Sequence, residues 1–201
     1  MTNSMNGVRP IVLASASPRR RELLTQIGVE FEVLPADIDE SCRVGEDIHH
    51  CVERISQEKA QAVLQLRPEA VVIGSDTMVV VGGEVLGKPT DRAQALWMLE
   101  CLSGKTHEVL TGIAVADRNQ QESMVQQSRV EFREIDSAEA LSYWRTGEPQ
   151  GKAGGYAIQG LGACFVKNLQ GSYSGVMGLP VYELAQLLQR FGIGLLEANH
   201  A

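Results

Sequence analysis

The sequence has few aromatic residues, no excess of positive charge and no long apolar run, and each shortage excludes a class of protein. Phe, Trp and Tyr together make up 5% of the 201 residues, which leaves few platforms on which nucleic-acid bases could stack. The net charge of −7 also argues against a nucleic-acid partner, because nucleic-acid-binding domains are usually basic. No apolar stretch approaches the roughly 20 residues that span a bilayer. We therefore expect no nucleic-acid partner and no membrane attachment.

The four cysteines stand far apart in the sequence, and no two of them form a C-x-x-C pair: they are Cys42, Cys51, Cys101 and Cys164. The first ten residues lack the long apolar core of a signal peptide. We therefore interpret residues 1–9 as a disordered extension of a cytoplasmic protein. In that reducing compartment the cysteines are expected to be free thiols. The histidines form no H-E-x-x-H pair, which argues against a zinc site.

Strand patterns and helix patterns follow one another along the whole chain, which predicts an α/β protein. Helical patterns cover residues 18–28, 47–66, 91–102, 137–147 and 180–192, and strand patterns cover 10–15, 30–35, 70–73, 78–81, 107–117, 123–135 and 163–169. Strict βαβ alternation is missing, so the expected sheet is mixed, with helices on both sides. We expect a single domain over residues 10–193, built as two lobes around a cleft, and a tail over 194–201.

The start of the first predicted helix carries three cations where the backbone disfavours them. Ser17 is a suitable N-cap and Pro18 suits the first turn, but Arg19, Arg20 and Arg21 follow. The free N–H groups of a helix start carry a partial positive charge, so a cation there costs about 0.3–1 kcal/mol. A bound anion would relieve this repulsion, because helix starts and arginine side chains both bind phosphate. This basic patch in an acidic chain favours a small anionic ligand.

Asp76 stands in the segment GSDT at residues 74–77, between two β-rich runs. Ligands of α/β proteins bind beyond the ends of strands, which makes an acid at such an end a candidate catalytic group. The alternative is an aspartate that only caps a turn through its own backbone. Because strand residues flank it on both sides, an isolated acid here must be hydrogen-bonded, metal-bound or catalytic.

Two lysines and one acidic loop are further candidates, each with a plainer alternative. Lys59 lies one helical turn from an apolar residue, near the buried stripe of its helix. This position weakens the alternative that Lys59 is a lysine on a solvated helix face. Lys88 stands between Gly87 and Pro89, which would aim its side chain, although a solvated loop lysine is the simpler interpretation. The acidic run at residues 37–40 either supplies magnesium ligands or is an acidic surface loop.

Five motifs together resemble those of the Maf-like nucleoside triphosphate pyrophosphatases in their order and approximate spacing. They are LASASPRRRELL at residues 13–24, EKA at 58–60, GSDTMV at 74–79, LGKP at 86–89 and GKAGGYAIQG at 151–160. The resemblance covers residues 11–192. It implies a two-lobed, Maf/ITPase-like α/β fold with an elongated mixed sheet, flanking helices and a central cleft. The KAGGYAIQG form resembles the subgroup that acts on dTTP and UTP, rather than the one that acts on 7-methyl-GTP.

The resemblance also implies a reaction and a set of site residues. Water attacks a nucleoside triphosphate in the presence of a divalent metal cation, Mg²⁺ or Mn²⁺, and the products are the monophosphate and pyrophosphate. By position, Asp76 resembles the catalytic proton acceptor, acting directly or through a metal-bound water, and Glu40 and Asp76 match positions at the metal. Matching positions around the triphosphate are Ser15, Arg19, Arg20, Lys59 and Lys88, and those that set base preference are Arg19, Thr77 and Gln159.

Gln159 suits a pyrimidine edge. Its carbonyl can accept from N3–H of uracil while its amide donates to O4. A flipped amide would fit cytosine equally well, so discrimination requires a neighbour, with Thr77 as the candidate, to hold the amide in one orientation.

The resemblance further implies a homodimer and a link to arrest of cell division and septum formation. The alternative function is a non-catalytic nucleotide-binding regulator of septum formation. Asp76 argues against that alternative, because a protein that only binds gains nothing from an acid beside phosphates. An RNA-binding module is a third interpretation, which the acidic balance disfavours. Release of pyrophosphate separates the enzyme from the regulator.

Overall fold

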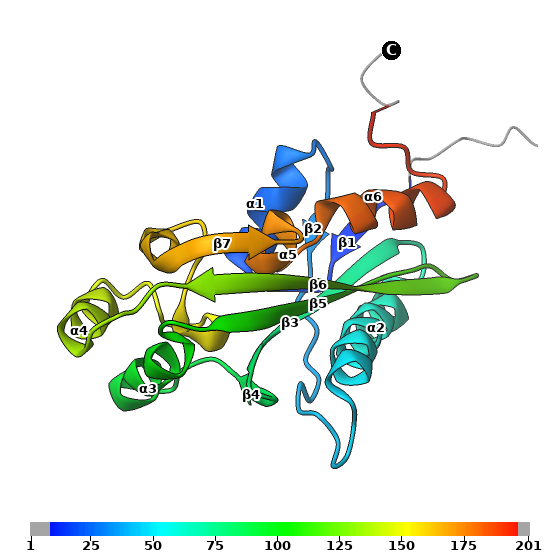
Figure 1. Ribbon diagram of the computed structural model, residues 1–201. Helices are drawn as coiled ribbons and strands as arrows, with labels where there is room; N and C mark the ends of the chain where they lie inside the picture. Colours follow the sequence, from blue (N-terminus) through cyan, green and yellow to red (C-terminus); the bar gives the residue numbers. More distant parts are fainter. Residues whose placement is uncertain (1–8, 197–201) are drawn as a thin grey trace, which may run out of the picture.

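A computed structural model describes residues 9–196, and one mixed sheet forms its centre (Figure 1). The strands are β1 (Ile11–Leu13), β2 (Glu32–Val33), β3 (Val71–Val81), β4 (Glu84–Leu86), β5 (Thr106–Ala116), β6 (Gln121–Phe132) and β7 (Val166–Gln170). Their order is β2-β1-β3-β5-β6-β7, with β4 paired on β3. The pairs β1–β2 and β1–β3 are parallel and the others are antiparallel. The predicted mixed α/β class is confirmed, whereas the division into two lobes stays a prediction.

Helices cover both faces of this sheet, as the sequence predicted. They are α1 (Pro18–Gln26), α2 (Ile48–Leu66), α3 (Arg92–Leu102), α4 (Ser137–Arg145), α5 (Tyr173–Met177) and α6 (Val181–Arg190), with short 3₁₀ helices at Ala153–Gly155 and Leu161–Phe165. Figure 1 shows α2 on one face of the long strands, α1, α5 and α6 on the other, and α3 beside α4 at one end. Over residues 9–196, no helix combines the length and the apolar character that crossing a membrane would need.

The side chains of β3 alternate between apolar cores on the two faces of the sheet. Val71, Ile73 and Val79 belong to the larger core, which the helices other than α2 complete. Val72 and Val80 point the opposite way, into two smaller clusters beneath α2. This period of two is what a strand buried on both faces requires.

Two glycines allow α2 to lie directly on the sheet. A Cβ atom at Gly74 in β3 would come within 2.1 Å of the carbonyl oxygen of Ser56, and one at Gly112 in β5 within 2.4 Å of that of Val52. Any side chain at these positions would push the helix away. The close approach brings Lys59, on the same helix, up to the centre of β3.

The structure corrects the predicted place of Asp76. The sequence predicted two strand segments interrupted by GSDT, but β3 runs without a break from Val71 to Val81. One edge of β3 pairs with β1 only over residues 71–73 and with β4 only over 79–81. Asp76 therefore lies in the middle of a strand, beside a gap between two short neighbours. At this gap the edge of β3 has no neighbouring strand, although the strand itself does not end there.

Smaller differences concern the ends of the chain and two short elements. Most of the predicted 1–9 extension and of the 194–201 tail lies outside the described residues. Arg9 is described, and its guanidinium pairs with Asp117. β2 has only two residues, both exposed, where a half-buried strand was predicted over 30–35. The short helix α5, in a glycine-rich region, was not predicted.

Candidate active site

One cavity of about 450 Å³ collects every residue that the sequence analysis assigned to the site. Its lining includes Ser15, Arg19, Arg20, Glu40, Lys59, Asp76, Thr77, Lys88 and Gln159. These residues come from six separate segments of the chain, and the cavity borders the gap in the sheet beside Asp76. Arg21, the third arginine of this helix start, is exposed and is not part of the lining.

Lys59 lies between two acidic side chains in this cavity. Its Nζ is 2.8 Å from Asp76 Oδ1 and 2.7 Å from Glu40 Oε1. The side chains of Lys59 and Asp76 are 6% and 12% exposed, and that of Glu40 is 44% exposed. Burial raises the pKa of Glu40, but the hydrogen bond and charge of Lys59 outweigh it, so the pKa lies below its usual value. The cavity thus holds a compact charged cluster, in which two carboxylates accept from one ammonium.

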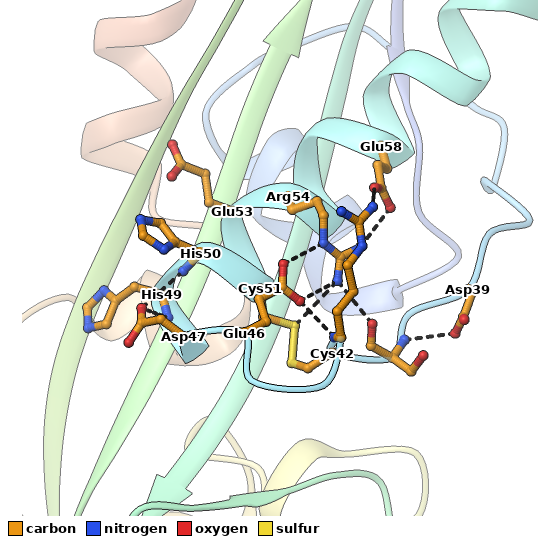
Figure 2. A network of polar contacts seen from close by, with 12 residues as sticks. Asp39, Cys42, Glu46, Asp47, His49, His50, Cys51, Glu53, Arg54 and Glu58 are labelled. Carbon is orange, nitrogen blue, oxygen red and sulfur yellow. Dashed lines mark hydrogen bonds and ion pairs between the residues drawn. A yellow bond between two sulfur atoms is a disulfide. The ribbon is translucent and has the colours of Figure 1, made fainter.

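An arginine on α2 holds the loop that carries Glu40 (Figure 2). Arg54 donates from Nε to Glu46 Oε1 at 2.6 Å and from Nη2 to the backbone oxygen of Ser41 at 3.0 Å. The hydrogen bonds from Arg54 lower the pKa of Glu46 to about 2, so this ion pair persists in weak acid. These contacts fix the chain on the C-terminal side of Glu40.

A disulfide in the same loop corrects the prediction of four free thiols. Cys42 is bonded to Cys51 at the start of α2, with their Cα atoms 5.4 Å apart (Figure 2). Cys101 and Cys164 are free, as expected. The positive φ of Gly45 turns the chain back toward the helix and brings the first two cysteines together. A spacing of nine residues does not reveal such a turn.

Arg20 donates three of its five N–H groups to protein acceptors. Its Nε donates to the backbone oxygen of Gly178 at 2.7 Å, its Nη1 to Ser15 Oγ at 2.9 Å and its Nη2 to Thr77 Oγ1 at 3.2 Å. Burial lowers the pKa of Arg20, and the charge of Asp76 partly opposes this shift. The guanidinium stays charged at neutral pH, because arginine is the most basic side chain of proteins. Arg20 therefore contributes a fixed positive charge and joins α1, β3 and the chain after α5.

The remaining cations of the cavity are held less tightly. Arg19 donates from Nε to the backbone oxygen of Met177 at 3.1 Å, which leaves the rest of its guanidinium for other acceptors. Lys88 is 65% exposed, and its Nζ is 3.7 Å from Glu40 Oε2. Lys152 also lines the cavity, and burial, followed by the charge of Arg19, lowers its pKa. The sequence analysis assigned no role to Lys152, although it lies in the GKAGG motif.

Ser17 occupies the N-cap position of α1, but its side chain makes no capping hydrogen bond. Its backbone N–H donates to Ser15 Oγ at 3.3 Å. The predicted side-chain cap is therefore wrong. No side-chain oxygen of Ser17 covers the start of α1, which lines the cavity through Ser17, Pro18 and Arg19. An uncapped helix start beside arginine is an anion-binding arrangement.

Thr77 and Gln159 lie on the lining but are not bonded to each other within residues 9–196. Thr77 Oγ1 accepts from Arg20 and from Thr111 Oγ1 at 3.1 Å. Gln159 is exposed, in the segment that follows Tyr156. No hydrogen bond joins the two side chains among the described residues, so the idea that Thr77 orients the Gln159 amide stays a prediction.

The chain is similar to known proteins over most of its length. The model of a family described as Maf-like protein matches residues 10–191. A dTTP/UTP pyrophosphatase of Colwellia psychrerythraea is 47% identical over 197 residues, which cover 96% of this chain and 93% of that protein. Another, from Saccharophagus degradans, is 50% identical and covers 91% and 89%. A solved nucleoside-triphosphatase (dITP/XTP pyrophosphatase) of Mycobacterium abscessus shows a TM-score of 0.42 at 14% identity over 63% of this chain and 75% of its own.

Proposed function

Because this chain belongs to the Maf-like protein family, we propose that it hydrolyses dTTP and UTP to the monophosphate and pyrophosphate. The observation that carries the proposal is the buried contact between Lys59 and Asp76, at the centre of a cavity rich in cations. Relatives from several bacteria, each nearly half identical over most of their length, carry the name dTTP/UTP pyrophosphatase.

The charge of the cavity supports a triphosphate ligand. A nucleoside triphosphate carries about four negative charges, which fixed cations and a metal compensate in most enzymes. Arg19, Arg20, Lys59 and Lys88 surround the cavity together with the start of α1. Arginine presents paired donors to phosphate oxygens, and lysine acts as a point charge. Thus the cations that disfavour the helix in the free chain become favourable once phosphate is bound.

The acidic pair fits a divalent cation as a cofactor. Mg²⁺ and Mn²⁺ prefer oxygen ligands, and magnesium is typically bound by one or two carboxylates together with substrate phosphates. Glu40 and Asp76 each lie within 2.8 Å of the Lys59 ammonium. These two carboxylates would hold the divalent cation in the cavity. When bound, the ion would neutralise charge that develops on the phosphates. A second cluster of possible metal ligands, formed by Cys42, Glu46 and Cys51, does not fit a metal ion, because the disulfide leaves no thiolate to coordinate it.

Asp76 is the proposed proton acceptor for the attacking water. Its carboxylate borders the cavity from the rigid centre of β3, and Lys59 fixes it through Oδ1. A carboxylate so held can orient a water and accept its proton as the water attacks the α-phosphorus, while pyrophosphate leaves. Gln159, with Arg19 and Thr77, is proposed to contact the base, because a glutamine amide matches both N3–H and O4 of uracil or thymine.

The first experiment is pyrophosphate release with Mg²⁺ across dTTP, UTP, CTP, the purine triphosphates and 7-methyl-GTP. We expect turnover of dTTP and UTP, and a loss of about 10²–10⁴ in kcat for Asp76→Asn with nucleotide binding retained. Glu100→Gln, an exposed acid on α3, is the matched control. If the wild type binds nucleotides but hydrolyses none, the protein is a nucleotide-binding regulator and not an enzyme. If Asp76→Asn keeps full turnover, Asp76 is not the proton acceptor.

We also propose a cytoplasmic homodimer, although a disulfide such as Cys42–Cys51 is rare in that reducing compartment. The cytoplasm supplies the nucleotide substrates, and exposed Tyr173 and Tyr182 offer apolar area for a second copy. Cell fractionation and sedimentation velocity test the location and the oligomeric state.

A further inference from the structure

The segment that carries Gln159 is anchored on both sides by two residues outside the cavity. On one side, the backbone N–H of Ala157 donates to the hydroxyl of Tyr143 at 3.1 Å. On the other, the backbone N–H of Leu161 donates to Glu148 Oε2 at 2.9 Å and that of Gly162 to Glu148 Oε1, also at 2.9 Å.

The two anchors are joined to each other. The Tyr143 hydroxyl donates to Glu148 Oε1 at 2.7 Å, so one carboxylate accepts three hydrogen bonds. Burial raises the pKa of Glu148, but the bonds from Gly162, Tyr143 and Leu161 outweigh it, and the pKa lies below its usual value. The carboxylate is therefore charged at neutral pH, and hydrogen bonds to a charged acceptor are about twice as strong as neutral ones.

Glycines make the close contact possible. A Cβ atom at Gly160 would lie 2.3 Å from Glu148 Oε2, and one at Gly162 would lie 2.7 Å from the Tyr143 hydroxyl. The segment is thus seated directly against both anchors. Gln159 lies within this span and is itself exposed at the cavity. Its position follows from the backbone on either side of it, which Tyr143 and Glu148 hold.

We propose that Glu148 and Tyr143 are positioning residues that hold the Gln159 segment for recognition of the nucleotide base. Neither side chain belongs to the lining of the cavity, so neither is a catalytic residue. The inference rests on the proposed function for the identity of the base. Their loss should weaken recognition of the nucleoside part of the substrate and leave the triphosphate site intact.

Two conservative variants test this proposal. Glu148→Gln keeps the shape but turns an N–H₂ group toward backbone donors, and Tyr143→Phe removes the hydroxyl shared by Ala157 and Glu148. For both we expect KM for dTTP and UTP to rise about tenfold or more, with kcat changed far less. The inhibition constant of inorganic tripolyphosphate, which has no base, should stay within about twofold of the wild type.

The matched control is Glu134→Gln, at an exposed position to which no role is assigned. An unchanged KM in both variants would overturn the proposal. Equal losses for nucleotides and tripolyphosphate would overturn it too, since they would show a general structural effect. If Glu148→Gln does not fold, Tyr143→Phe decides alone.

The failure of this proposal can be distinguished from failure of the proposed function. If the wild type binds dTTP but hydrolyses none, calorimetry can still measure the affinity of the Glu148→Gln and Tyr143→Phe variants for dTTP and for tripolyphosphate. A selective loss of dTTP affinity would then support the positioning role, whereas unchanged affinity for both ligands would refute it.

Discussion

Lys59 and Asp76 are 17 positions apart in the sequence, and their charged atoms lie 2.8 Å apart in the folded chain. The contact joins α2 to the centre of β3, where the glycine at position 74 lets helix and strand meet. Lys59 is nearly buried and touches both acids of the cavity. It is therefore a cation whose position the fold determines.

Replacing this lysine should disable the enzyme more than it disturbs the fold. Lys59→Met keeps the side-chain volume and removes a fixed charge where negative charge develops during the reaction. We expect kcat for dTTP to fall by about 10²–10³, measured by pyrophosphate release, with circular dichroism close to that of the wild type. Lys105→Met, at an exposed turn lysine, is the control. Full activity of Lys59→Met would show that the pair with Asp76 is only structural.

His107 should make the protein lose stability in mild acid. Its Nε2 lies 2.8 Å from the Tyr156 hydroxyl, its Nδ1 has no partner within the described residues, and burial lowers its pKa to about 4. The unfolded state, with a pKa of 6.5, binds a proton that the folded state does not. His107 therefore destabilises the folded protein in acid. This destabilisation is absent above pH 6.5, grows as the pH falls toward 4 and levels off below it. The difference between the unfolded-state and folded-state pKa values corresponds to a loss of about 3 kcal/mol in the free energy of unfolding.

The measurement is urea unfolding of the wild type and His107→Phe between pH 7.5 and 4. Subtracting the two curves removes the carboxylates that both proteins share. We expect the variant to gain relative stability as the pH falls, whereas His49→Phe, at an exposed position, should show no such gain. Parallel curves for wild type and His107→Phe would contradict the shifted pKa.

Opening the Cys42–Cys51 disulfide should destabilise the protein by about 2–3 kcal/mol, because the bridge closes a short loop in the unfolded chain. Urea unfolding with and without dithiothreitol measures this difference, and a Cys42→Ser/Cys51→Ser variant should show none. Thiol titration in denaturant should find two thiols, Cys101 and Cys164, before reduction and four after it. Four thiols in the purified, unreduced protein would show that the bridge does not form.

Local patterns in the sequence were enough to predict most helices and strands. The α2 helix begins after Asp47, which accepts hydrogen bonds from the backbone N–H groups of His49 and His50, and its apolar residues recur at helical spacing. Such signals act over one or two turns, so a window of sequence contains them. The β3 strand was broken wrongly at GSDT for the opposite reason: Gly and Asp disfavour a strand locally, and pairing with β5 over residues 72–80 outweighs that preference.

By itself, the sequence determined the α/β class, the order of the elements and, through five ordered motifs, which residues gather around the cavity. It did not determine how those residues are held. Three contacts each depend on atoms from separate segments. They are the contact of Lys59 with Asp76, the disulfide of Cys42, and the hydrogen bonds of Glu148 to the segment of Gln159. Only the packing of α2 on β3, and of loops against that frame, brings these atoms within hydrogen-bonding distance. Tertiary structure decides such contacts because distance in space, and not spacing along the chain, sets the strength of a charge pair or hydrogen bond.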